Sequence, residues 1–231
     1  MARQQSRVQA TGILHSQRPG RSVPSFEARV HFWFEAKFGE PYTPLSSTDA
    51  YDLHPRFLAQ FHKSTRESYS EAIHLAGQAL DIDPCYAPAA ALGALTRGLQ
   101  LTQGFARPDE ALFAEFARRA VQYGKDDPDA LWMTAMGIAL AGDAQTGASL
   151  VDRALSLNSN LAHARMTRGW IHIWLNQPKP AVDAFQRAMR LSPFDPLGYF
   201  FAGGLAGAAV EEGRYEDAIA SADRALQEEG W

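Results

Sequence analysis

Small side chains recur along this sequence at a fixed helical spacing. A small or apolar residue is followed by another four positions later, then by an alanine three positions after that. The closing alanines are separated by 41, 34, 34 and 37 residues; they are Ala79, Ala120, Ala154, Ala188 and Ala225. Positions i, i+4 and i+7 share one face of an α-helix, and small residues there let a second helix approach closely. The spacing therefore predicts a helix that recurs five times, each time packed against a partner helix.

A period of 34 residues is the length of the tetratricopeptide repeat (TPR), which folds as two antiparallel helices. The first helix of each pair should also carry a small residue where another helix comes near, and Gly93, Gly137 and Gly169 occupy such positions. Residues 162–195 match the repeat most fully, although Arg168 stands where the repeat prefers a large apolar residue. We predict an all-α, right-handed α-solenoid of about five TPR-like helix pairs over residues 49–231.

Composition supports an all-α class. The chain has 39 alanines among 231 residues, against seven valines and seven isoleucines. Alanine loses no side-chain entropy in a helix, whereas β-branched residues favour sheets. These numbers argue against a β-sandwich, a β-barrel and a doubly wound α/β fold.

Local signals predict where several helices begin and end. Residues 64–67 have the pattern of a capping box, with Ser64 as the N-cap. An N-cap aspartate before a proline is expected at Asp127 and at Asp195. Glycine stops between paired helices are expected at Gly142 and Gly213.

Two features depart from a regular repeat. The interval of 41 residues implies about seven extra residues, which we place in a turn at 103–109. Pro55 falls inside the expected first helix, so this helix either begins near His54 or is kinked at the proline.

The first 48 residues differ from the rest of the chain. They carry six Lys and Arg against three Asp and Glu, whereas residues 49–231 carry 16 against 23. Thirty-five of the 39 alanines lie in the second part. We expect residues 1–48 to be a poorly ordered basic leader with at most one short helix, around 26–38. A basic nucleic-acid arm is the alternative, but the charges are sparse and unclustered.

The overall charge, hydropathy and cysteine content exclude further classes. The net charge of −4 provides no general electrostatic attraction for a phosphate backbone, so we expect no nucleic-acid partner. No apolar stretch reaches the roughly 18 residues of a membrane span, and no secretory signal is visible. The single cysteine, Cys85, fits a reducing cytoplasm. We predict a cytoplasmic protein without a membrane partner.

The sequence carries no motif for catalysis, for a cofactor or for a metal. Phosphate-binding glycine loops, a nucleophile elbow and paired helical histidines are all missing from it. The glycine-rich segment 203–207 lies where a first helix belongs, which favours close helix packing over a phosphate cradle. We therefore predict a protein that is not an enzyme and that has no cofactor and no metal site.

One cluster of side chains is a candidate binding face, on the first helix of the fourth pair. Its inward positions are predicted to be His163, Met166, Trp170, Ile173 and Trp174. Trp170 and Trp174 are i, i+4 neighbours and could anchor a peptide on an exposed wall. The alternative is that both rings fill the seam between adjacent repeats.

Two arginines lie beside this face. Arg165 and Arg168 could bind a carboxylate of the partner by bidentate pairing. Equally, they could pair with Asp183 or with other acidic neighbours in the fold.

The chain also resembles a particular bacterial TPR module over roughly residues 49–231. The segments that carry the resemblance are 50–53, 61–67, 79–89, 169–175 and 190–196. They resemble the C-terminal region that follows the catalytic domain in many bacterial class III adenylate/guanylate cyclases. Similar regions follow the winged-helix domain of some transcriptional regulators. The resemblance implies a regulatory or protein-binding role and does not imply cyclase activity.

Two functions are compatible with these observations. The first is a non-catalytic scaffold that binds a partner peptide or helix in the concave TPR groove. The second is a detached regulatory or sensor TPR module of a bacterial adenylate cyclase or transcriptional regulator. The final helix ends at Trp231 without a further cap helix, which leaves the C-terminal repeat open to self-association.

Overall fold

The computed structural model describes residues 50–105 and 110–229. The chain divides into two units at residue 42, and every described residue belongs to the second unit. The leader predicted over residues 1–48 lies outside the described residues, so its boundary and its helix stay predictions.

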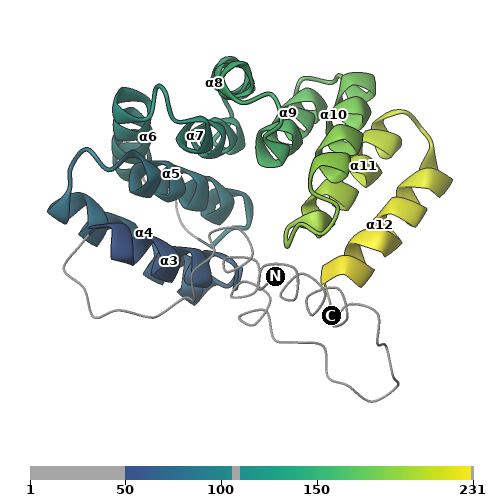
Figure 1. The fold of residues 1–231 in the computed structure, drawn as a ribbon. Helices are drawn as coiled ribbons and strands as arrows, with labels where there is room; N and C mark the ends of the chain where they lie inside the picture. Colours follow the sequence, from purple (N-terminus) through teal and green to yellow (C-terminus); the bar gives the residue numbers. More distant parts are fainter. Residues whose placement is uncertain (1–49, 106–109, 230–231) are drawn as a thin grey trace, which may run out of the picture. The chain divides into compact units, whose positions relative to one another are not determined.

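The described residues form ten helices and no strand (Figure 1). Consecutive helices make five antiparallel pairs, which confirms the all-α solenoid fold. None of the described helices has the length and apolarity to cross a lipid bilayer. The helices are α3 (Ala50–Phe61), α4 (Arg66–Ile82), α5 (Ala87–Thr102), α6 (Glu110–Tyr123), α7 (Pro128–Leu140), α8 (Ala144–Leu157), α9 (Ala162–Trp174), α10 (Pro178–Leu191), α11 (Gly198–Glu211) and α12 (Tyr215–Glu229).

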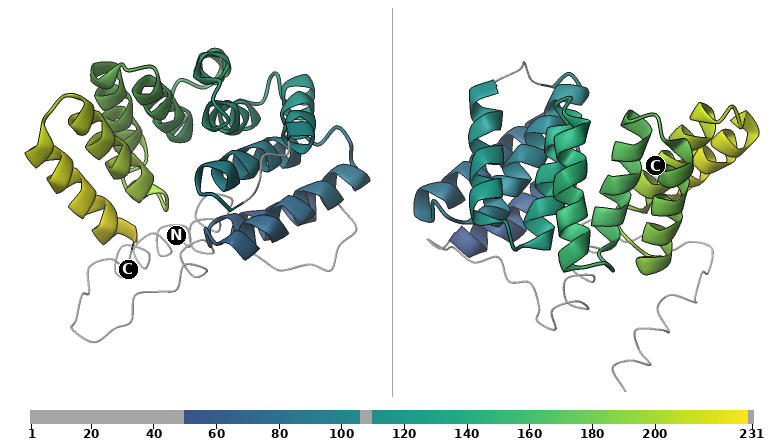
Figure 2. Two further views of the ribbon diagram at one scale, coloured as in Figure 1. Left: turned by 180° about the vertical axis from the view of Figure 1, so that it is seen from behind. Right: turned by 90° about the horizontal axis from the view of Figure 1, so that it is seen from above.

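The first helices of successive pairs stand in a row. Helix α5 contacts α7, α7 contacts α9, and α9 contacts α11. Helices α4, α6, α8 and α10 each pack on their own first helix and on the first helix of the next pair, whereas α12 packs on α11, as Figure 2 shows from two further directions. This nearest-neighbour contact pattern is that of a helical repeat array.

The recurring alanines form the inner contact of each pair. Ala79, Ala120, Ala154 and Ala188 are fully buried, as the i, i+4, i+7 pattern predicts. Ala225 is only half-buried, because α12 has α11 on one side and no following helix among the described residues.

The predicted close approach of a neighbouring helix to Gly93, Gly137 and Gly169 is confirmed. A Cβ atom added to Gly137 would lie 2.6 Å from the carbonyl oxygen of Ala94, so the backbones of α5 and α7 are in contact. A Cβ on Gly93 or Gly169 would instead overlap an aromatic ring of the paired helix, Phe116 or Phe185 respectively. Both kinds of contact leave room only for hydrogen at these positions.

Two of the predicted helix starts are wrong by a few residues. The capping box is made by Thr65 and Ser68, one residue later than predicted. The backbone amide of Ser68 donates to the Thr65 hydroxyl, and the backbone amide of Thr65 donates to the Ser68 hydroxyl. Asp195 is not the N-cap of α11, which begins at Gly198 after Leu197. The Asp195 carboxylate accepts a hydrogen bond from the Leu197 amide instead.

The other predicted helix boundaries agree with the structure. Of the two alternatives for the first helix, the start near His54 is excluded. Asp127 caps α7, and Pro128 is its first residue. Gly142 and Gly213 follow α7 and α11 with φ of 108° and 72°, in the left-handed region that glycine tolerates. Helix α3 begins at Ala50 and runs through Pro55, so a start near His54 is wrong.

The seven extra residues of the long interval are divided between a helix and a turn. Helix α5 has 16 residues where α7 has 13, which accounts for three of them. The other four lie between the end of α5 at Thr102 and the start of α6 at Glu110, where residues 106–109 are outside the described part of the chain. The prediction that all of them lie in the 103–109 turn is therefore wrong, because one extra helical turn absorbs part of the insertion.

We expect Gly137→Ala to lower the free energy of unfolding by about 1–3 kcal/mol, because the added methyl meets immobile backbone of α5. Gly77→Ala in α4 is the matched control, since no atom lies within 4 Å of its added Cβ. That control should raise the free energy of unfolding by about 0.5–1 kcal/mol through helix propensity. Urea unfolding of both variants measures the difference, and equal effects would contradict a backbone contact at Gly137.

Candidate functional site

A cavity of about 240 Å³ opens on the row of first helices. Most of its described walls come from the first helices, and the rest come from Tyr69 of α4 and from the turns after α3, after α5 and before α11. The residues that line it are Phe61, His62, Ser64, Tyr69, Leu95, Leu99, Thr102, Gln103, Trp132, Met136, Leu140, Met166, Trp170, Trp174, Leu197, Tyr199 and Phe200.

The lining follows the repeat. Helix α7 contributes three residues at i, i+4 and i+8, namely Trp132, Met136 and Leu140. Helix α9 contributes Met166, Trp170 and Trp174, each 34 residues after its counterpart in α7. In α11, Phe200 follows Met166 by the same interval. The cavity is thus lined by equivalent positions of neighbouring repeats.

Trp170 and Trp174 lie at the junction of cavity and seam. Their rings are stacked with centroids 6.0 Å apart. Trp170 also meets Phe185 of α10 edge-on at 5.6 Å and Phe200 of α11 at 6.2 Å. Trp174 remains 39% exposed. Trp170 therefore packs between repeats and lines the cavity at once, while Trp174 presents an open aromatic surface.

The other candidates of the fourth pair lie in different places. Met166 is buried and lines the cavity, but His163, Arg165 and Ile173 do not. Ile173 lies beside Gly207 of α11. Arg165 donates to the carbonyl oxygen of Ser159 at 2.9 Å, in the turn before its own helix.

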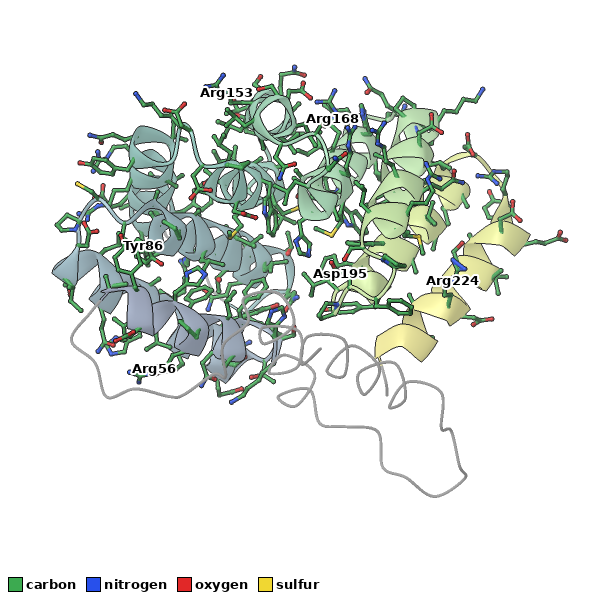
Figure 3. The ribbon with its side chains drawn as sticks, viewed as in Figure 1. Arg56, Tyr86, Arg153, Arg168, Asp195 and Arg224 are labelled. Atoms are coloured by element: carbon green, nitrogen blue, oxygen red, sulfur yellow. The ribbon has the colours of Figure 1, made fainter. Side chains whose placement is uncertain are left out.

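Arg168 lies toward the neighbouring second helix. It pairs with Asp152 of α8 and donates to Nε2 of His172. Figure 3 shows it beside α8, well away from Asp195, which lies in the turn between α10 and α11. The acidic neighbour of Arg168 is thus Asp152 rather than Asp183. Neither this arginine nor Arg165 reaches the cavity lining, so a carboxylate-binding role for the pair there has no support.

A hydrogen-bonded pair lies beside one wall of the cavity. Nε2 of His163 lies 3.2 Å from Oδ1 of Asp195, and the His163 ring stacks on Trp132 at 5.1 Å. Burial raises the pKa of the Asp195 carboxyl, but the hydrogen bond from His163 and its charge outweigh burial and hold this pKa below its ordinary value. The pair connects α9 to the turn that carries Leu197 into the lining.

His62 faces the same region from the opposite end of the row. Burial lowers its pKa from the ordinary 6.5 to about 4, and the nearby His163 lowers it further while Asp195 opposes the change. His62 is therefore neutral at neutral pH. It brings no charge into the cavity under those conditions.

No group of three His, Cys, Asp or Glu side chains placed to hold a metal ion occurs within residues 50–105 and 110–229. The lining within those same residues contains no lysine, arginine, aspartate or glutamate. What the described walls provide is apolar and aromatic contact, with a few neutral polar groups at the edge.

Solved TPR structures share this fold. The TPR protein TTC0263 of Thermus thermophilus is 18% identical, with a TM-score of 0.61 over 78% of this chain and 91% of that chain. PilF of Pseudomonas aeruginosa is 18% identical, with a TM-score of 0.53 over 79% of each chain. At such low identity the similarity shows the fold alone, a TPR-type helical solenoid.

No protein-family model and no curated protein sequence matches this chain. The resemblance of residues 49–231 to cyclase-associated TPR regions therefore stays a prediction.

Protonation of His62 should destabilise the fold. Because its pKa is lower in the folded than in the unfolded chain, its contribution to stability is complete above pH 6.5 and is lost as pH falls toward about 4. We expect His62→Gln to reduce the decline of unfolding free energy across this window, as measured by urea unfolding at a series of pH values.

His74→Gln is the matched control, since His74 is an exposed histidine on α4. A change of slope in His74→Gln as large as that in His62→Gln would show that the effect is not specific to the buried histidine. If the unfolding free energy of His62→Gln falls with pH as steeply as that of the wild-type protein, folding does not lower the pKa of His62.

Proposed function

We propose that this chain is a non-catalytic protein-interaction scaffold that binds a segment of a partner protein along its row of first helices. The observation that carries the proposal is the cavity itself. Three consecutive first helices, α7, α9 and α11, contribute repeat-equivalent side chains to one apolar lining, and α5 adds Leu95 and Leu99. The stacking of repeats by itself creates an extended binding surface of this kind.

The exposure of the aromatic side chains supports binding over simple core packing. Trp174 is 39% exposed and Trp170 is half-buried, although both lie on an apolar wall. Apolar surface gathered around a concavity is typical of recognition sites, and tryptophan is enriched among the residues that dominate binding energy. A partner that covers Trp174 would remove this surface from water.

The site residues of the proposal combine prediction and structure. Met166, Trp170 and Trp174 come from the face predicted on the fourth pair, and Trp132 and Met136 extend it onto α7. Their side chains supply large contact area with few rotatable bonds, or, for methionine, an adaptable surface. A peptide or helix that crosses α7 and α9 would first contact Trp174 and Trp170, while Trp132, Met136 and Met166 line the cavity from buried positions.

The resemblance to cyclase-associated regions supports a second form of the proposal. In it the same face receives a segment of a cyclase or a transcriptional regulator, and the chain acts as a regulatory or sensor module. The DNA next to the coding sequence discriminates the two forms, because a cyclase or winged-helix region there favours the second. The single cysteine supports placing either form in the cytoplasm.

Removal of one exposed ring should weaken partner binding while it leaves the fold intact. We expect Trp174→Ala to lower the affinity for the partner about 30-fold, which corresponds to about 2 kcal/mol for a residue that dominates an interface. The full-length tagged chain is used to capture partners from a lysate of its source cells. Captured proteins are quantified by mass spectrometry and then titrated as purified proteins.

Phe194→Ala is the matched control, because Phe194 is 87% exposed and lies outside the cavity lining. It should capture the partner as the wild-type chain does. A partner retained equally by the wild-type chain and Trp174→Ala would place binding elsewhere and contradict the proposal.

A further inference from the structure

The chemistry of the lining restricts what a partner can insert into it. Within the described residues the cavity carries seven phenylalanine, tyrosine and tryptophan side chains, four leucines and two methionines. Its remaining members are His62, Ser64, Thr102 and Gln103, and none of these bears a fixed charge. A lysine or glutamate side chain buried here would lose its hydration and find no opposite charge in that lining.

His62 does not alter this conclusion at neutral pH. Burial keeps its imidazole uncharged by lowering its pKa to about 4. His163 and Asp195 do not line the cavity, and they hydrogen-bond each other across 3.2 Å. The site is therefore complementary to an uncharged group.

The volume of the cavity limits the size of the insert. An apolar cavity of about 150 Å³ in another protein accommodates one benzene molecule. A cavity of about 240 Å³ therefore has room for one bulky side chain. Trp132 and Trp170 offer aromatic faces and edges to such a side chain, and Met136 and Met166 offer sulfur contacts to its ring.

We propose that the partner anchors itself by inserting one bulky uncharged aromatic side chain, tryptophan or phenylalanine, between α7 and α9 against Met136, Met166 and Trp170. This inference rests on the proposed function, and it defines the partner as a segment with a single aromatic anchor and no charge at that position.

Methionine methyl resonances of the full-length chain test the anchor directly. The probes are N-acetyl-tryptophanamide, N-acetyl-alaninamide, N-acetyl-lysinamide and the α-amide of N-acetyl-glutamate. The tryptophan probe should shift the methyl signals of Met136 and Met166. The signals of Met133 and Met189, which do not line the cavity, should stay where they are. Its affinity should exceed that of the alanine probe about tenfold or more, and the charged probes should cause no shift at equal concentration.

Two charge-introducing variants serve as a matched pair. Trp174→Glu places a carboxylate beside the proposed anchor and should weaken binding of the tryptophan probe about tenfold, while Phe194→Glu should leave it unchanged. Both positions are exposed in the wild-type chain, so each variant keeps its core. Circular dichroism confirms the fold of each variant before titration.

The outcomes separate this inference from the proposed function. Equal shifts from the lysine probe, or shifts of Met189 as large as those of Met166, would overturn the aromatic anchor. Capture of a partner that depends on Trp174, together with no response to the tryptophan probe, would also overturn the anchor while the scaffold proposal stands. A specific response to the tryptophan probe without any captured partner would support the anchor chemistry and count against the scaffold proposal.

Discussion

The contact of backbone with backbone between α5 and α7 is the constraint on which the array depends. Gly137 faces the Ala94 carbonyl at a distance that excludes any side chain, and Gly98 faces the Gly137 carbonyl in the same way. Contacts of this kind set the separation of neighbouring first helices with little freedom, because backbone atoms cannot change rotamer. The buried alanines of the second helices likewise let each second helix pack closely against the first helices. Regular spacing of the row follows from these small residues.

Regular spacing has a chemical consequence on the other face of the row. When neighbouring helices are related by one repeat, residues 34 apart occupy equivalent positions, and Met136 and Trp170 line the same cavity in this way. Side chains that are unremarkable on one helix therefore combine into an apolar wall across several. The cavity therefore depends on the array as a whole. The small residues at the contacts between helices bring the first helices close together, and this brings their large apolar side chains into one lining.

Much of this architecture could be predicted from local pattern. The five recurring helices, the close contacts at Gly93, Gly137 and Gly169, and the stops at Gly142 and Gly213 all follow from spacing and backbone preference. The misplaced caps at Ser64 and Asp195 show the limit of that approach, because neighbouring polar residues compete for the same amide groups. For the site, Trp170 and Trp174 were visible as an i, i+4 pair. Trp132 and Met136 were missed, although shifting the α9 face back by one 34-residue period identifies both.

The sequence by itself determined the helical repeat, since periodic small residues and alanine-rich faces are sufficient to specify paired helices. Tertiary structure alone decided which side chains meet. His163 and Asp195 shift the pKa of His62 although both lie more than 100 residues from it in the sequence, and no local pattern relates them to it. Likewise, Arg165 lies away from the cavity because a turn carbonyl takes its guanidinium. Such choices depend on distances between helices, which arise only when the whole row is packed.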